Sequence, residues 1–272
     1  MKIKQESHFL KSLIRSAQEG SVVPAGMQRP YVWGHNDVEA LMESLLSGYP
    51  VGAFTLWDIQ SGSGLDPQSV GKARLGPIVP EHRGATPELL VLDGQNRLAS
   101  IAWMSVRESE IEALRQRDDI SEQERAVWLA DQRLVFDGEA NAVVFVPQDE
   151  VERGLRIPAW VLVESRNMAE VRRHWDRMES EGVAEDRIHA WMRKFDEAEQ
   201  AFSNARVTST IIERATPDEA RHAFLRICRT GVPMSDADFD AALQWNANDS
   251  SDLAPEQIER PTPARPATHA PG

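Results

Sequence analysis

The chain has 272 residues, of which 41% are hydrophobic, and its 30 basic and 43 acidic side chains give a formal net charge of −13. This length allows one large domain or two small ones, and the hydrophobic fraction is sufficient for a sizeable core. The negative charge repels phosphate backbones, so contact with DNA would need a local basic patch or a partner. A free nucleotide is less demanding, because one pocket with one or two arginines suffices.

Several classes of protein are excluded by short sequence features. The single cysteine, Cys228, excludes an internal disulfide and a cysteine-rich zinc site. The polar start, residues 1–6, lacks the apolar core of a signal peptide, and no run approaches the ~20 apolar residues of a membrane span. No P-loop motif occurs, and no histidine pairs with another histidine or cysteine at a metal-ligand spacing. We therefore expect a soluble cytoplasmic protein that has no contact with membranes.

The first part of the chain predicts short helices and strands. Apolar periodicity and breaker residues predict helices over 8–18 and 36–46, an extended segment over 22–33 and a strand over 53–59. Asn36 and Glu39 have the spacing of a capping box for the second helix. Residues 60–88 are rich in glycine and proline, and we interpret them as a surface insertion, with a cover over a pocket as the alternative.

The most informative segment is residues 89–98, with the sequence LLVLDGQNRL. Four apolar residues lead into Asp93 and Gly94, and an amphipathic segment follows, which predicts a strand, a tight turn and a helix. The free N–H groups at such a helix N-terminus can hold an anion. Arg97, on the first helical turn, could bind phosphate oxygens through bidentate hydrogen bonds from its guanidinium. Its alternative role is an ion pair with Asp93.

A second polar and aromatic cluster lies in the extended segment. Arg29 could contact a phosphate, and Tyr31 or Trp33 could stack on a nucleobase, although packing is the commoner fate of such rings. In an extended chain these three side chains share one face. A joint site also requires this segment to lie beside the Asp93 turn.

The rest of the chain alternates strands and helices. We expect paired strands over 132–137 and 142–147, helices over 167–180 and 184–202, a strand over 207–212, and helices opening at Thr216 and Ser235. Thr216 and Glu219 form a capping box, with Pro217 at the first helical position. The proline-rich tail, 246–272, is predicted to be disordered.

Three blocks in order resemble the DUF262 family, which includes GmrSD-type modification-dependent restriction enzymes. The blocks are residues 93–97, which match an Asp-Gly-Gln-Gln-Arg signature, residues 28–33 with 48–52, and residues 224–235. The resemblance spans about residues 8–243. Asn96 replaces the usual second Gln, which shortens the reach of the amide, and Cys228 replaces the usual Asn of the late block.

The resemblance implies a mixed α+β fold with a ParB/sulfiredoxin-like nucleotide-binding part over 1–110 and a mainly helical part over 111–245. It implies a nucleotide-binding, NTP-hydrolysing module of prokaryotic defence against foreign or modified DNA. The alternative is a non-catalytic module that senses a nucleotide or a partner and regulates a separate effector. The HNH-like nuclease domain of many relatives has no counterpart before the tail, so we expect no DNA cleavage by this chain alone and allow for a nuclease or effector partner.

The resemblance also assigns residues. It implies catalytic roles for Asp93, Gln95 and Arg97, and a nucleoside triphosphate with Mg²⁺ as the bound species. Asp93 could contact the Mg²⁺ through a water molecule. The residues implied in nucleotide binding are Gln28, Arg29, Tyr31, Trp33, Gly94 and Asn96.

Overall fold

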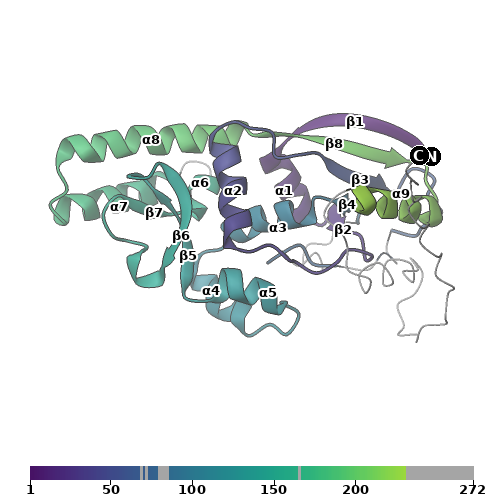
Figure 1. Ribbon diagram of the computed structural model, residues 1–272, viewed down its shortest axis with the longest axis horizontal. Coiled ribbons are helices and arrows are strands. Elements are labelled where there is room, and N and C mark those ends of the chain that lie inside the picture. The colour runs from purple at the N-terminus through teal and green to yellow at the C-terminus, as the bar shows by residue number, and fades with distance from the viewer. Residues whose placement is uncertain (68–69, 71–72, 79–85, 165–166, 231–272) are drawn as a thin grey trace, which may run out of the picture.

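The computed structural model describes residues 1–67, 70, 73–78, 86–164 and 167–230, with the backbone alone at 228–230. The helix predicted to open at Ser235 and the predicted tail, 246–272, lie outside the described residues. Within them the fold is α+β, as predicted, with one mixed five-stranded sheet and one smaller sheet (Figure 1).

The larger sheet has the strand order β1-β8-β3-β4-β2. Its strands are β1 (Lys2–Phe9), β2 (Val22–Pro24), β3 (Phe54–Asp58), β4 (Leu89–Asp93) and β8 (Arg206–Glu213). β1 pairs with β8 and β3 pairs with β4 in antiparallel fashion, whereas β3 is parallel to β8 and β2 is parallel to β4. The sequence motif therefore begins at the end of an inner strand, β4, between β3 and β2.

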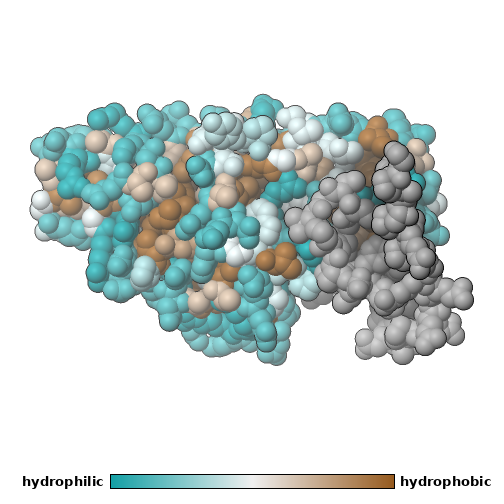
Figure 2. All heavy atoms as spheres, viewed as in Figure 1, coloured by the Kyte–Doolittle hydropathy of each residue, from teal (hydrophilic) through white to brown (hydrophobic). Residues whose placement is uncertain are grey.

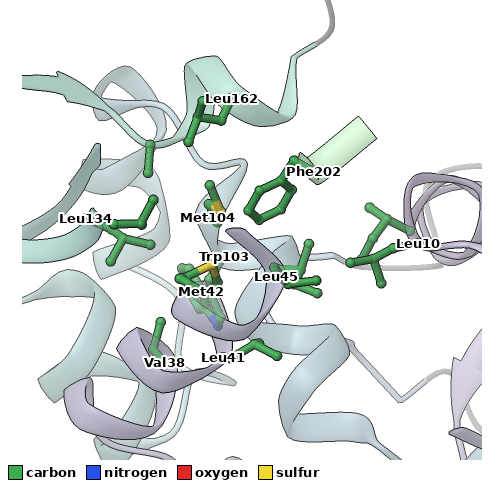
Figure 3. Packing of buried hydrophobic residues seen from close by; sticks show 14 of the residues in the cluster. Leu10, Val38, Leu41, Met42, Leu45, Trp103, Met104, Leu134, Leu162 and Phe202 are labelled. Carbon is green, nitrogen blue, oxygen red and sulfur yellow. The ribbon is translucent and has the colours of Figure 1, made fainter. Parts of the chain in front are cut away.

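Helices cover both faces of this sheet. α1 (Leu10–Glu19), α2 (His35–Leu46) and α3 (Gln95–Met104) pack on one face, and α9 (Pro217–Thr230) packs on the other. Successive side chains of β4 point to opposite faces of the sheet. Val91 belongs to the hydrophobic cluster on the face of α1, α2 and α3 (the first cluster), and Leu90 and Leu92 belong to the cluster on the face of α9 (the second cluster). Figure 3 shows the centre of the first cluster, where α2 side chains meet Trp103 of α3 and Phe202.

The second sheet lies at the other end of the molecule (Figure 1). It has the order β6-β5-β7, formed by β5 (Gln132–Asp137), β6 (Ala142–Pro147) and β7 (Arg156–Pro158). Helices surround it: α4 (Glu108–Arg115), α5 (Glu122–Glu124), the π-helix η2 (Arg125–Leu129), the 3-10 helix η3 (Gln148–Glu150), α6 (Trp160–Val163), α7 (Met168–Ser180) and α8 (Glu185–Asn204). The β5–β6 hairpin and the two long helices are found where the sequence predicted them.

Near the N-terminus one strand was not predicted, and the predicted capping box of α2 was wrong. β1 was not predicted, and it takes the first two residues of the expected helix, 8–18. Asn36 and Glu39 do not cap α2: the N-cap is the extended Gly34, whose N–H donates to Asp37 Oδ2 at 2.9 Å. Glu39 instead accepts a hydrogen bond from the N–H of Phe145 in β6. Its carboxylate is therefore used in a tertiary contact and not in the helix cap that the sequence pattern predicted.

The described part of segment 60–88 is tied into the fold. Val70 and Leu75 are buried, and Leu75 forms a β-bridge with Ile78. The interpretation of this segment as a surface insertion was therefore wrong for these residues, because they contribute to the core.

The expected boundary at residue 110 remains a prediction, as does the ParB/sulfiredoxin likeness. β8 returns the chain from the second part to an inner position of the first sheet, between β1 and β3. Among the described residues, no helix is both long enough and apolar enough to cross a membrane.

Candidate functional site

The centre of the candidate site is the turn that joins β4 to α3. Gly94 is the N-cap of α3 with φ of +96°, and a Cβ at this position would overlap the ring of Phe54. Only glycine therefore fits here without strain. Among the described residues, no side chain caps α3 and no acidic residue lies in its first turn. The N–H groups at this end of the helix are thus suited to an anion.

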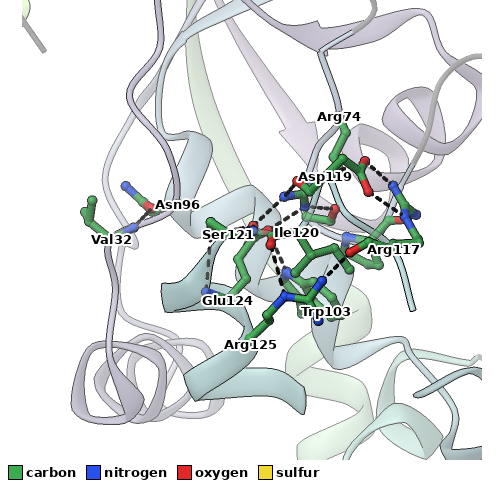
Figure 4. Close-up of polar contacts among 12 residues, drawn as sticks. Val32, Arg74, Asn96, Trp103, Arg117, Asp119, Ile120, Ser121, Glu124 and Arg125 are labelled. Carbon is green, nitrogen blue, oxygen red and sulfur yellow. Dashed lines mark hydrogen bonds and ion pairs between the residues drawn. The ribbon is translucent and has the colours of Figure 1, made fainter. Parts of the chain in front are cut away.

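The extended segment of the second cluster lies against this turn. Gln28 Nε2 donates to the carbonyl oxygen of Val91 at 3.0 Å, and the N–H of Val32 donates to Asn96 Oδ1 at 3.1 Å (Figure 4). The structure therefore places the two sequence clusters side by side, as a joint site requires. Asn96 acts here as a tether for the segment.

A cleft of about 490 Å³ opens between these elements. Gln28, Arg29, Tyr31 and Gln95 line one side of it. Arg29 makes no hydrogen bond or ion pair with the residues that the structure describes, so its guanidinium is available to a ligand. The side-chain oxygen of Gln95 is buried without a hydrogen-bond partner among the described residues.

The cleft lining also includes three acidic side chains, which the sequence did not predict. Glu124 is 2% exposed and accepts hydrogen bonds from Arg74, from Ser121 and, at 3.2 Å, from Trp103 Nε1 (Figure 4). Burial alone would raise the pKa of Glu124, but the hydrogen bonds and charge of Arg74 outweigh it and lower the pKa below 4.5. Asp118 and Asp119 are the other two, and Asp119 forms ion pairs with Arg117 and Arg74.

Arg97 does not line the cleft. Its Nη1 donates to the carbonyl oxygen of Val51 at 2.6 Å, and its Nη2 donates to the carbonyl oxygen of Ala53 at 2.9 Å and to Asp93 Oδ2 at 3.1 Å. Its guanidinium carbon lies 4.9 Å from the ring centroid of Phe54. Burial lowers the pKa of Arg97, while Asp93 opposes that shift. The structure therefore gives Arg97 a clamping role at the entry to β3.

Asp93 lies at the edge of the same turn, outside the cleft lining. Its side chain is 46% exposed, and its contact with Arg97 is the ion pair that the sequence offered as an alternative. Among the described residues, no group of three or more histidine, cysteine, aspartate or glutamate side chains is arranged to hold a metal ion.

The two aromatic side chains of the second cluster lie in different surroundings. Tyr31 is buried in the cleft wall, where its hydroxyl lies 2.8 Å from Ser100 Oγ, and burial raises its pKa to about 12. Trp33 packs partly buried against the main core, and its carbonyl oxygen accepts from Gln123. The structure thus brings Gln28, Arg29, Tyr31 and Gln95 together and leaves Trp33, Asp93 and Arg97 outside the cleft lining.

Comparison with known proteins found one curated relative and one family model that match this chain. An uncharacterized protein of Methanocaldococcus jannaschii is 32% identical over 107 residues, which are 38% of this chain and 18% of that protein. The chain thus matches less than a fifth of that relative's length. The family model of the N-terminal domain of the GmrSD restriction endonuclease matches residues 10–243. The chain therefore belongs to the family of GmrSD restriction endonuclease N-terminal domains.

Proposed function

We propose that this chain is the nucleotide-binding module of a restriction-type defence system, and that the cleft beside the β4–α3 turn holds the nucleotide. Family membership supports the role in defence. The observation that carries the nucleotide assignment is the arrangement of Arg29, a cation without a partner among the described residues, in one cleft with Gln95 at the uncapped start of α3.

The two halves of this arrangement act on the same chemical group. A helix N-terminus presents N–H donors and a partial positive charge, and a guanidinium can donate bidentate hydrogen bonds. Phosphate oxygens can accept hydrogen bonds from both groups. The carboxylate of Asp118 disfavours a phosphate beside it, whereas Glu124 and Asp119 are paired with arginines. We therefore place the phosphates beside Arg29 and the sugar and base toward Ser121 and Asp118.

Hydrolysis is the finer part of the proposal. Mg²⁺ would be held mainly by the phosphates, with Asp93 contacting it through water, and it would neutralise charge that develops on the phosphates. Gln95 is suited to orient a water molecule, because its amide lies at the first turn of α3 in the cleft wall. Arg97 supports this geometry through the backbone and does not contact the phosphates.

The alternative is a sensor that binds a nucleotide without hydrolysing it and regulates a separate nuclease or effector. The engagement of Arg97 by Val51, Ala53 and Asp93 favours this alternative, because it removes one candidate cation from the phosphates. In both cases the ligand and the cleft are the same.

A titration of the purified chain with the four ribonucleoside triphosphates, with and without Mg²⁺, tests the proposal, and phosphate release is followed in parallel. Binding with release that is lost in Asp93→Asn supports hydrolysis. Binding without release supports the sensor. No binding of any triphosphate contradicts the proposed function.

A further inference from the structure

A second pocket of about 610 Å³ lies between α4, the small sheet and α7, apart from the nucleotide cleft. Its lining includes four aromatic side chains: Trp103, Trp128, Phe145 and Trp160. The rings of Trp103 and Trp128 stack with an interplanar angle of 7°, and Phe145 meets Trp128 edge-on. Pockets of this volume with an apolar, aromatic lining are typical of small-molecule sites.

In the wall of the pocket, the planar guanidinium of Arg107 lies over the aromatic ring of Trp160. The guanidinium carbon of Arg107 lies 5.0 Å over the centroid of Trp160. Glu164 fixes this guanidinium, because it accepts from Nε at 3.0 Å and from Nη2 at 2.6 Å. The Arg107 side chain is 49% exposed. A flat ligand ring can therefore stack on the guanidinium, which is how proteins commonly hold unstacked bases.

The charges of the lining indicate what kind of ring fits. The lining holds three guanidiniums and four carboxylates, those of Glu108, Asp149, Glu152 and Glu170. Each guanidinium has a carboxylate partner: Arg107 pairs with Glu164, which lies outside the lining, Arg133 with Glu108, and Arg173 with Glu152 and Glu170. An anion would find no unpaired cation and a surplus of negative charge. The polar rim instead offers donors and acceptors to the edge of a neutral ring.

We propose that this pocket binds an uncharged heteroaromatic ring of the nucleobase type, stacked on Arg107. Such a ring has a flat face for the Arg107–Trp160 platform and a polar edge for the carboxylate and guanidinium rim. The pocket shares no lining residue with the proposed nucleotide cleft, although Trp103 of the pocket donates a hydrogen bond to Glu124 of that cleft. The ring can come from a free nucleoside or from an unpaired base in DNA.

Calorimetry with adenosine, guanosine, cytidine and thymidine tests the pocket. At least one nucleoside is expected to bind. Arg107→Lys keeps the charge and loses the planar fork, so it should weaken that binding at least fivefold without changing the fold. Arg172→Lys is the matched control: Arg172 pairs with Asp176 on the exposed face of α7, and neither residue lines the pocket. The nucleoside should bind the Arg29→Ala variant as it binds the parent, which separates this site from the nucleotide cleft.

Two DNA duplexes identify the source of the ring. If a duplex with one unpaired base competes with the nucleoside and a fully paired duplex does not, the ring belongs to DNA. If neither duplex competes, the ring belongs to a free nucleoside. The inference is overturned if no nucleoside binds, if Arg107→Lys binds as tightly as the parent, or if the nucleoside monophosphate binds as tightly as the nucleoside in an Arg107-dependent manner.

Discussion

The Nη1 atom of Arg97 lies 2.6 Å from the carbonyl oxygen of Val51, a residue 46 positions earlier in the chain. With the second contact to Ala53, this joins the helical end of the motif to the segment that enters β3. Arg97 of the motif therefore has a structural role in this chain, and we expect its replacement to lower the free energy of unfolding.

Arg97→Ala should lower the free energy of unfolding by roughly 2–3 kcal/mol. The side chain is 17% exposed, and its loss leaves two carbonyl oxygens without their charged donor. Urea unfolding measures the change. Arg153→Ala serves as the control, since its surface ion pair with Asp149 should contribute less than about 1 kcal/mol. Equal, small losses in both variants would show that Arg97 does not clamp the turn.

Gly52→Ala should destabilise the protein more than Gly48→Ala. Both glycines have positive φ, +82° and +70°, so each substitution carries a backbone penalty of about 1 kcal/mol. A Cβ at Gly52 would also overlap Nη1 of Arg97, whereas a Cβ at Gly48 meets nothing within 4 Å among the described residues. Thermal unfolding of the two variants, measured side by side, checks this; equal melting temperatures would contradict the packing of Arg97 on Gly52.

Arg74→Ala should cost about 3–5 kcal/mol, because it leaves the buried carboxylate of Glu124 without a cation. Its effect should depend on pH. The pKa of Glu124 is lowered in the folded protein, so the stabilisation by this pair is present above pH 4.5 and is lost as the pH falls through the folded pKa. The double variant Arg74→Ala/Glu124→Gln should recover part of the loss at pH 7. No recovery would argue that Arg74 acts through packing alone.

His174 should make stability fall between pH 6.5 and pH 4. The side chain is fully buried, and burial, with the charge of Arg173 second, lowers its pKa from 6.5 to about 4. The unfolded chain therefore binds a proton in this range that the folded chain does not, which weakens the folded state by about 3 kcal/mol at the lower limit. Urea unfolding across this range should show a smaller fall for His174→Leu. The exposed His189→Leu should follow the parent; identical slopes for all three would remove His174 as the cause.

The parts of the fold that the sequence predicted are those decided by local pattern. Residues 89–98 combine an apolar run, a glycine turn and a helical period, and the structure has β4, Gly94 and α3 in that order. The capping box of Thr216 and Glu219 is also confirmed, with the N–H of Thr216 donating to Glu219 at 2.9 Å. β1 was missed because most of its residues are exposed on both faces, so its sequence lacks the alternation of a half-buried strand.

The parts of the site that the sequence did not predict depend on partners far apart in the chain. Glu124 is an ordinary acidic residue in the sequence, and its partner, Arg74, lies 50 positions earlier in a segment that was interpreted as a surface insertion. The carbonyl partners of Arg97 carry no side-chain signal at all. By contrast, the sequence indicated a joint site between the Arg29 cluster and the Asp93 turn, and a joint site would bring Arg29, Arg97 and Asp93 together. In the structure Gln95, and neither Arg97 nor Asp93, lines the cleft with Arg29.

Calorimetry of Mg²⁺–nucleoside triphosphate binding to the parent and to Arg29→Ala decides whether this cleft holds the nucleotide. Arg29 has no partner among the described residues, so its removal should leave the melting temperature unchanged. We predict a loss of roughly 1.5–3 kcal/mol in binding free energy, which is at least a tenfold weaker affinity, with Arg153→Ala binding like the parent. An Arg29→Ala protein that is folded and binds the triphosphate as tightly as the parent would contradict the assignment of the nucleotide to this cleft.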